Sequence, residues 1–126
     1  YQKTENRDIT AAISHATVTT AHDLNAAAIV TVTKSGTTAR MISKFRPYTR
    51  IVGATTSDKV YRQLVLSWGV FPVKCDEKKN TDALFDHAVE VSKKANVLKH
   101  GDIAVITAGI PLGISGTTNM LKVQVV

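Results

Sequence analysis

The sequence is poor in cysteine and aromatic residues and lacks a long apolar run. Its one cysteine, Cys75, excludes an intramolecular disulfide and any zinc site built from several cysteines. No apolar run approaches the ~18 residues that a membrane-spanning helix needs, so we expect no membrane partner. Aromatic residues make up 6% of the chain, which leaves few rings to stack on bases and argues against a nucleic-acid partner.

Three common sequence signatures of enzymes are missing as well. The chain contains no Walker phosphate loop, no GxGxxG glycine motif and no HExxH zinc motif. Any ligand site must therefore be inferred from less specific patterns.

The remaining composition is typical of one globular domain. Hydrophobic residues make up 44% and charged residues 21% of the 126 residues, which suits a single domain over residues 1–126 with a sizeable core. Lys and Arg number 16 and Asp and Glu 10, so the net charge is +6. The chain begins with Tyr1 rather than Met and has no charged segment followed by an apolar one. We therefore expect a cytoplasmic segment of a larger protein, without a secretory signal.

Helical and extended patterns alternate along the chain. Apolar residues at three- and four-residue spacing predict a helix from about Asp8, a good N-cap, to Leu24. Further helices are expected at residues 39–45, at 57–68 between Ser57 as N-cap and Gly69, and at 81–95 with Thr81 as N-cap. Short apolar runs predict strands at residues 27–33, 50–55, 70–75, 102–108 and 120–126.

This order of elements predicts a three-layer α/β/α domain whose sheet is mostly parallel. The last connection, residues 109–119, contains Pro111 and three glycines but no helical pattern, whereas a parallel crossover usually holds a helix. We therefore expect the last strand to be antiparallel and to lie at an edge. Pro72 favours an edge position for the third strand too.

The tetrapeptide Ser-Gly-Thr-Thr occurs twice, at residues 35–38 and 115–118. The first copy lies between a predicted strand and a predicted helix, where backbone N–H groups, the hydroxyls of Thr37 and Thr38 and the positive helix end suit a phosphate. Lys34 adds positive charge, and Gly36 allows a close approach. If the first and fourth strands are neighbours, both copies meet in one pocket at the carboxyl ends of the strands. The alternative is that both copies serve only as ordinary turns and caps.

No catalytic constellation emerges from the remaining residues. Asp82, Asp86 and Glu90 form one charged stripe on a predicted helix, which is typical of a solvated face. Cys75 has no histidine nearby, so an inert thiol is expected. The histidines fall on predicted helices or in a turn and are expected to be solvated or packed: His15, His22, His87 and His100. The residues therefore predict a phosphate-binding domain without its own catalytic machinery.

Residues 32–47 resemble the corresponding stretch of pyruvate kinases, as do residues 11–20, 68–72 and 101–119. These stretches occur in the same order as in that family and cover nearly the whole chain, but they match only the C-terminal domain of the enzyme. The resemblance implies a five-stranded mixed sheet of order 3-2-1-4-5 with an antiparallel fifth strand. That order puts the first and fourth strands side by side.

The resemblance also implies what this segment lacks. In pyruvate kinases, transfer of phosphate from phosphoenolpyruvate to ADP uses magnesium and usually potassium, in a barrel domain and its lid. Neither domain corresponds to this chain, so we expect no catalytic residue, no metal or other cofactor and no activity of the segment alone. The C-terminal domain of the family holds the effector site and part of the tetramer interface. The implied partners are a phosphorylated effector, the other domains of the enzyme, and further copies of the chain that meet partly through the strand from Leu121 to Val126.

The resemblance further implies which residues hold the effector. In family members activated by fructose bisphosphate, a Thr-Lys-Ser-Gly-x-Ser/Thr loop grips one phosphate. The matching residues here are Thr33, Lys34, Ser35, Gly36, Thr37 and Thr38. A second loop of the family closes over the effector. It corresponds here to residues 110–118, with Gly113, Ser115, Gly116, Thr117 and Thr118.

One departure from the family pattern bears on the effector. Animal enzymes hold a second phosphate with a Trp and an Arg near the fourth helix, and Leu84 stands about where that Arg falls. A single phosphate, as in ribose phosphate, AMP or another sugar monophosphate, therefore fits better. Lys78 and Lys79 leave fructose bisphosphate open.

Two further hypotheses compete with effector binding. In the first, the domain is purely structural and serves assembly, because Leu121, Val123 and Val125 alternate with Lys122 and Gln124 as in an edge strand. Only a purely structural role competes with effector binding, because one domain can both assemble and bind an effector. In the second, the chain is a free-standing phosphosugar enzyme, which requires a general base that the sequence does not offer.

Overall fold

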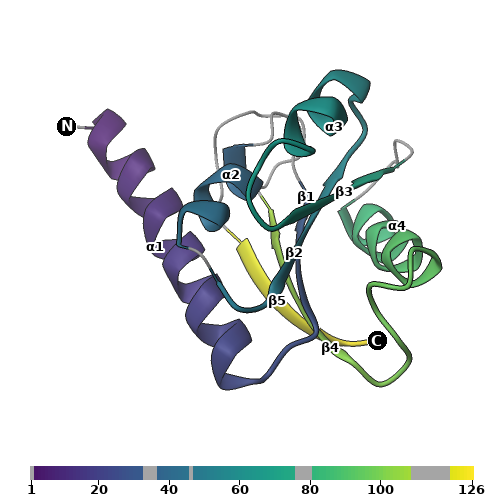
Figure 1. Ribbon diagram of the computed structural model, residues 1–126. Helices are drawn as coiled ribbons and strands as arrows, with labels where there is room; N and C mark the ends of the chain where they lie inside the picture. Colours follow the sequence, from purple (N-terminus) through teal and green to yellow (C-terminus); the bar gives the residue numbers. More distant parts are fainter. Residues whose placement is uncertain (1, 33–36, 46, 76–80, 109–119) are drawn as a thin grey trace.

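The computed structural model describes residues 2–32, 37–45, 47–75, 81–108 and 120–126. Helices and strands alternate until β4, which β5 follows directly in the order of elements (Figure 1). The elements are α1 (Gln2–Asp23), β1 (Ala28–Val32), α2 (Thr37–Lys44), β2 (Arg50–Thr55), α3 (Asp58–Leu64), β3 (Val70–Lys74), α4 (Thr81–Lys94), β4 (Ile103–Ala108) and β5 (Met120–Val125).

The sheet has the predicted topology. Its five strands lie in the order β3-β2-β1-β4-β5. The pairs β1·β2, β1·β4 and β2·β3 are parallel, whereas β5 pairs antiparallel with β4. The expectations of a mostly parallel sheet, of β3 at one edge and of an antiparallel last strand at the other are therefore confirmed.

Helices cover both faces of the sheet. On one face, Phe85 of α4 packs in a cluster with Val30 of β1 and Ile106 of β4. On the other face, Ile42 of α2 packs with Ile29 of β1, and α1 and α3 lie on the same side (Figure 1). Successive residues of β1 thus point to opposite cores, which explains why its sequence is apolar without alternation.

The first helix begins earlier than the sequence predicts. It starts at Gln2, so Asp8 lies inside the helix and the expected N-cap at Asp8 is wrong. The residues before Asp8 are mainly strong helix formers but carry no apolar stripe, so hydrophobic periodicity does not detect them.

The third helix begins as predicted and ends early. Ser57 is its N-cap, with the Ser57 hydroxyl accepting a hydrogen bond from the Val60 N–H at 3.3 Å. The helix ends at Leu64, so the expected continuation to Trp68 is wrong. Tight turns follow, in which the Leu66 and Ser67 N–H groups donate to the carbonyls of Gln63 and Leu64.

Gly53 of β2 leaves room for the side chains of Leu64 in α3 and Val70 in the neighbouring strand β3. A Cβ atom at this position would lie 2.7 Å from Leu64 Cδ1 and 3.1 Å from Val70 Cγ1. Leu64 is fully buried, so it has little room to move away.

We expect Gly53→Ala to lower the free energy of unfolding by about 1–3 kcal/mol through overpacking. Urea denaturation followed by circular dichroism measures the change. The double variant Gly53→Ala/Leu64→Ala should lose less than the sum of the two single variants, because Leu64→Ala removes the clashing methyl group. Strict additivity of the two changes would contradict this account.

An exposed ion pair joins the start of α3 to the end of β3. The Lys74 ammonium donates a hydrogen bond to the Asp58 carboxylate, and this contact holds the pKa of Asp58 below its ordinary value of 3.8. The charges of Lys74 and Arg62 act in the same direction.

We expect the stabilisation from Asp58 to be present above its ordinary pKa and to be lost as the pH falls through its lowered pKa in the folded protein. An NMR titration of the Asp58 carboxyl carbon measures that pKa. Lys74→Met should move the pKa back toward 3.8, whereas Lys122→Met on β5 should leave it unchanged. An Asp58 pKa that is unaffected by Lys74→Met would exclude the ion pair as the cause.

Candidate functional site

The carboxyl ends of β1 and β4 lie side by side. Val32 and Ala108, the last residues of these strands, are paired in the parallel register. The order of strands reverses here. From β1 the chain adds β2 and then β3 along one edge of β1, and it adds β4 and then β5 along the opposite edge. In open α/β sheets, ligands bind at the carboxyl ends of the strands where the order reverses.

The structure therefore confirms the condition for the two Ser-Gly-Thr-Thr segments to meet. The first segment follows β1 and the second follows β4, and these strands are neighbours. The contacts of the segments stay a prediction, because most of the predicted site lies outside the residues that the structure describes. The site residues that lie outside are Thr33, Lys34, Ser35, Gly36, Gly113, Ser115, Gly116, Thr117 and Thr118.

The described part of the predicted site is the start of α2. The helix begins at Thr37 and continues with Thr38, a residue that is 5% exposed. Its first turn carries no acidic residue, and Lys44 lies in its last turn. The positive end of the helix dipole at Thr37 is therefore not offset by a carboxylate of the helix itself.

Other residues considered as catalytic candidates are buried, packed against rings or exposed to solvent. Cys75 is buried, as expected of an inert thiol. The His15 ring packs against Phe45 with a centroid distance of 5.7 Å, and His22 contacts Tyr48. Asp86 and Glu90 are exposed on α4, as expected of a solvated stripe. In the described part of the chain, no group of three or more His, Cys, Asp or Glu residues is arranged to hold a metal ion.

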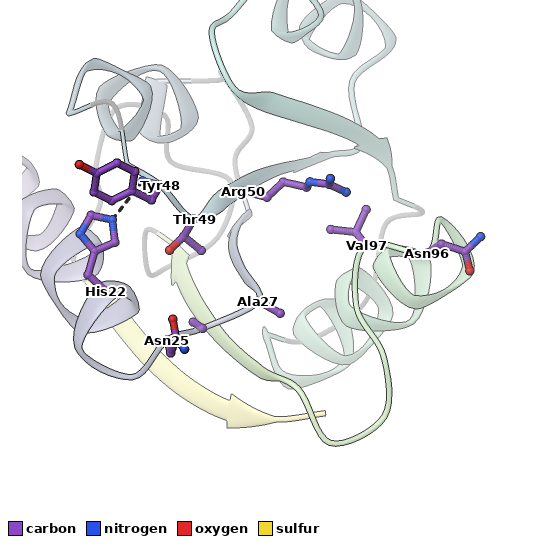
Figure 2. Close-up of a pocket in the computed structure, with 9 residues that line it drawn as sticks. His22, Asn25, Ala27, Tyr48, Thr49, Arg50, Asn96 and Val97 are labelled. Atoms are coloured by element: carbon purple, nitrogen blue, oxygen red, sulfur yellow. Dashed lines mark hydrogen bonds between the residues drawn. The ribbon is translucent and has the colours of Figure 1, made fainter.

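A polar pocket that sequence reasoning missed lies at the opposite end of the sheet, beside the starts of β1 and β2 (Figure 2). Its volume is about 550 Å³. The α1–β1 turn, the segment before β2 and the α4–β4 turn form its walls. On one wall the Tyr48 backbone N–H donates to His22 Nε2 at 3.1 Å, and the two rings lie 5.4 Å apart. This contact joins the end of α1 to the segment before β2.

Two asparagines flank this pocket and close the ends of helices. Asn25 after α1 and Asn96 after α4 have φ angles of 54° and 62°. The N–H groups of Ala26 and Val97 donate to the carbonyls of Ala21 and Ser92 five residues earlier, which is the Schellman pattern. An asparagine directly after a helical pattern is the sequence signal for such a cap. The proximity of the two turns follows only from the strand order.

The chemistry of this pocket does not favour catalysis. Arg50 lines the pocket together with Asn25 and Asn96, which lie in the turns at the C-terminal ends of α1 and α4, where the helix dipoles are negative. Among the described lining residues no carboxylate or thiol accompanies His22, so no acid–base pair is present.

Comparisons with known proteins agree with the fold and with the predicted family. Residues 11–124 match the family model for the alpha/beta domain of pyruvate kinase. The chain is 46% identical to the pyruvate kinase of Clostridium acetobutylicum over 122 residues, which is 97% of this chain and 26% of that protein. It is 41% identical to the pyruvate kinase of Lactobacillus delbrueckii subsp. bulgaricus over 126 residues, which is 100% of this chain and 21% of that protein.

The chain thus spans about a quarter or less of these relatives. Among its described residues, no helix is long and apolar enough to cross a membrane.

Proposed function

From the premise that this chain belongs to the family of pyruvate kinase C-terminal alpha/beta domains, we propose that it binds a phosphorylated allosteric effector. The effector lies between the loop of residues 33–38 and the loop of residues 113–118. The observation that carries this proposal is the pairing of Val32 with Ala108, because it starts both loops from adjacent strand ends.

The charge distribution supports an anionic ligand. The phosphate group carries a charge near −2 at neutral pH. The α2 helix presents its amino end beside the first loop, without an acidic residue in its first turn. Arg40 of α2 and the net charge of +6 add to the attraction. Oriented N–H groups at the helix start would bind the phosphate oxygens.

One bound phosphate suffices for this site. Leu84 stands where the Arg that holds a second phosphate is expected from the resemblance, so a sugar monophosphate or AMP fits better than fructose bisphosphate. Binding would order the second loop. An effector that orders this loop in only one of two quaternary states binds that state more tightly, which is the requirement for allostery.

We expect calorimetric titration of the segment with AMP, ribose phosphate and fructose bisphosphate to detect binding of at least one of them. Thr38→Ala should weaken that binding by about 1–3 kcal/mol, because phosphate oxygens lose a hydroxyl donor. Ser92→Ala is the matched control, since it removes another buried hydroxyl, one that donates to the Ala88 carbonyl within α4. Circular dichroism checks that both variants fold. Absence of binding by all three compounds at millimolar concentration would contradict the proposal for the segment.

The parent protein we propose is a pyruvate kinase that transfers phosphate from phosphoenolpyruvate to ADP in the cytoplasm. Its magnesium and potassium sites lie in the other domains, so the segment alone is inactive in a kinase assay. The two relatives compared above are pyruvate kinases about four to five times as long as the matched region, which supports this assignment.

A second role, assembly of the parent tetramer, is favoured by the exposed edge of the sheet. β5 pairs on one side with β4 and forms the end of the sheet. Val123 and Val125 on this strand are 45% and 68% exposed. An exposed edge strand with apolar side chains pairs readily with its counterpart across a two-fold axis.

We expect Val125→Lys to raise the dissociation constant of the assembled parent enzyme about tenfold or more, because a charged side chain would replace an exposed apolar one on each of the two edge strands that pair. Sedimentation velocity over a dilution series measures this constant. Lys122→Gln, on the same strand, is the control and should leave assembly intact. An unchanged dissociation constant for Val125→Lys would exclude this strand from the interface.

A further inference from the structure

A side chain in the last turn of α1, His22, joins this helix to the α2–β2 connection. The Tyr48 backbone N–H donates to His22 Nε2 at 3.1 Å, and the two rings lie 5.4 Å apart (Figure 2). Tyr48 is 98% exposed, so the ring contact covers little of its surface. The hydrogen bond is therefore the specific link between the two segments.

This hydrogen bond forms with only one protonation state of the imidazole. A ring nitrogen accepts a hydrogen bond only when it carries no proton, so the neutral ring has its proton on Nδ1. The imidazolium has an N–H at both nitrogens and no acceptor. Protonation at Nε2 therefore places one N–H against another, that of Tyr48, and breaks the link. An imidazole ordinarily changes its charge between about pH 5 and 8.

The charged groups around the imidazole oppose one another. The negative end of the α1 dipole and the adjacent carboxylate of Asp23 favour the imidazolium. Arg50, which lines the same pocket, and Lys44, at the end of the helix packed beside α1, disfavour it. The α4–β4 turn contributes the neutral Asn96, and the phenol of Tyr48 is uncharged in this pH range. Among the described residues that line the pocket, no carboxylate pairs with the imidazolium.

His15, about two helical turns earlier in α1, makes a different contact with the same connection. Its ring packs against Phe45 with a centroid distance of 5.7 Å. The sequence spacing puts His15 and His22 on one face of α1, and both residues are exposed. A protonated imidazole can still lie against an aromatic ring. Because the contact of His15 needs no free acceptor, this residue is the internal reference for His22.

We propose that His22 and Tyr48 form a proton-dependent latch between α1 and the α2–β2 connection. The neutral imidazole holds the Tyr48 N–H, and the imidazolium releases it. Pro47 is buried and β2 begins at Arg50, so the released part is confined to Tyr48 and Thr49. These two residues and His22 line one side of the pocket, so release opens that side as the pH falls (Figure 2). The latch requires neither effector binding nor assembly of the parent enzyme.

The test is an NMR titration of the chain between about pH 5 and 8. The carbon resonance of His22 Cε1 reports protonation of the ring, and the Tyr48 amide proton reports the hydrogen bond. We expect the Tyr48 resonance to move with the same midpoint as the His22 resonance. Exchange of this amide with water, corrected for its intrinsic dependence on pH, should become about two- to tenfold faster at the acid end, as expected for the loss of one hydrogen bond.

Two substitutions at this exposed position separate the acceptor from the ring. His22→Gln keeps an acceptor that does not titrate, so the Tyr48 amide should stay protected at every pH. His22→Phe keeps a ring beside Tyr48 but has no acceptor, so the amide should exchange at the faster rate throughout. His15→Gln is the matched control, because it removes the other histidine of α1 and should leave the Tyr48 titration unchanged.

A Tyr48 amide that stays constant while the His22 ring titrates would overturn the proposal. A Tyr48 titration that persists in His22→Gln, or one that His15→Gln abolishes, would overturn it too, since another group would then cause the change. Circular dichroism shows whether each variant folds. The comparison of the two midpoints in the unsubstituted chain needs no variant, so a variant that fails to fold does not protect the proposal from refutation.

Discussion

The complete enclosure of β1 is the constraint on which the rest of this domain depends. All of its five residues are buried, and it pairs with β2 along one edge and with β4 along the other. A strand in this position must be apolar on both faces, so it needs helices on both faces of the sheet. Because both neighbours are parallel to it, their carboxyl ends meet at one place, and the loops that leave β1 and β4 start there together.

This arrangement also separates the two ends of the domain. Loops that follow the strands gather at the carboxyl end, whereas the ends of α1, α2 and α3 gather at the amino end with the exposed residues Tyr48, Leu66 and Trp68. The amino end carries these exposed apolar side chains as well as the polar pocket beside the starts of β1 and β2. The short helix α2 spans the distance between the two ends. The Ser43 hydroxyl donates a hydrogen bond to the Trp68 carbonyl. The C-terminal end of α2, which lies at the amino end of the sheet, is therefore held by more than the hydrogen bonds of the helix itself.

Much of the fold could be predicted from the sequence because strong local signals coincide with the elements. The apolar run of β1, the Ser57 cap and the edge position of Pro72 are of this kind. Where the signal is weak the prediction fails. Gln2 begins a polar turn of helix that has no apolar stripe, and Trp68 continues a helical spacing although the helix has ended. The adjacency of β1 and β4, on which the predicted convergence of the two Ser-Gly-Thr-Thr segments depends, could be predicted from the sequence, but the pocket beside Tyr48 and Asn96 could not. It is formed by turns that only the three-dimensional arrangement brings together.

The position of β1 has a consequence for how the chain is made. Its partner β4 is separated from it by most of the sequence, as the pairing of Val30 with Ile106 illustrates. During synthesis β1, β2 and β3 leave the ribosome first, and the central strand keeps one edge unpaired until residues 103–108 follow. Closing that long loop is slow, and an unpaired apolar edge is prone to join other chains. The half-made domain is therefore the aggregation-prone species, and a truncation before β4 leaves the protein permanently in that state.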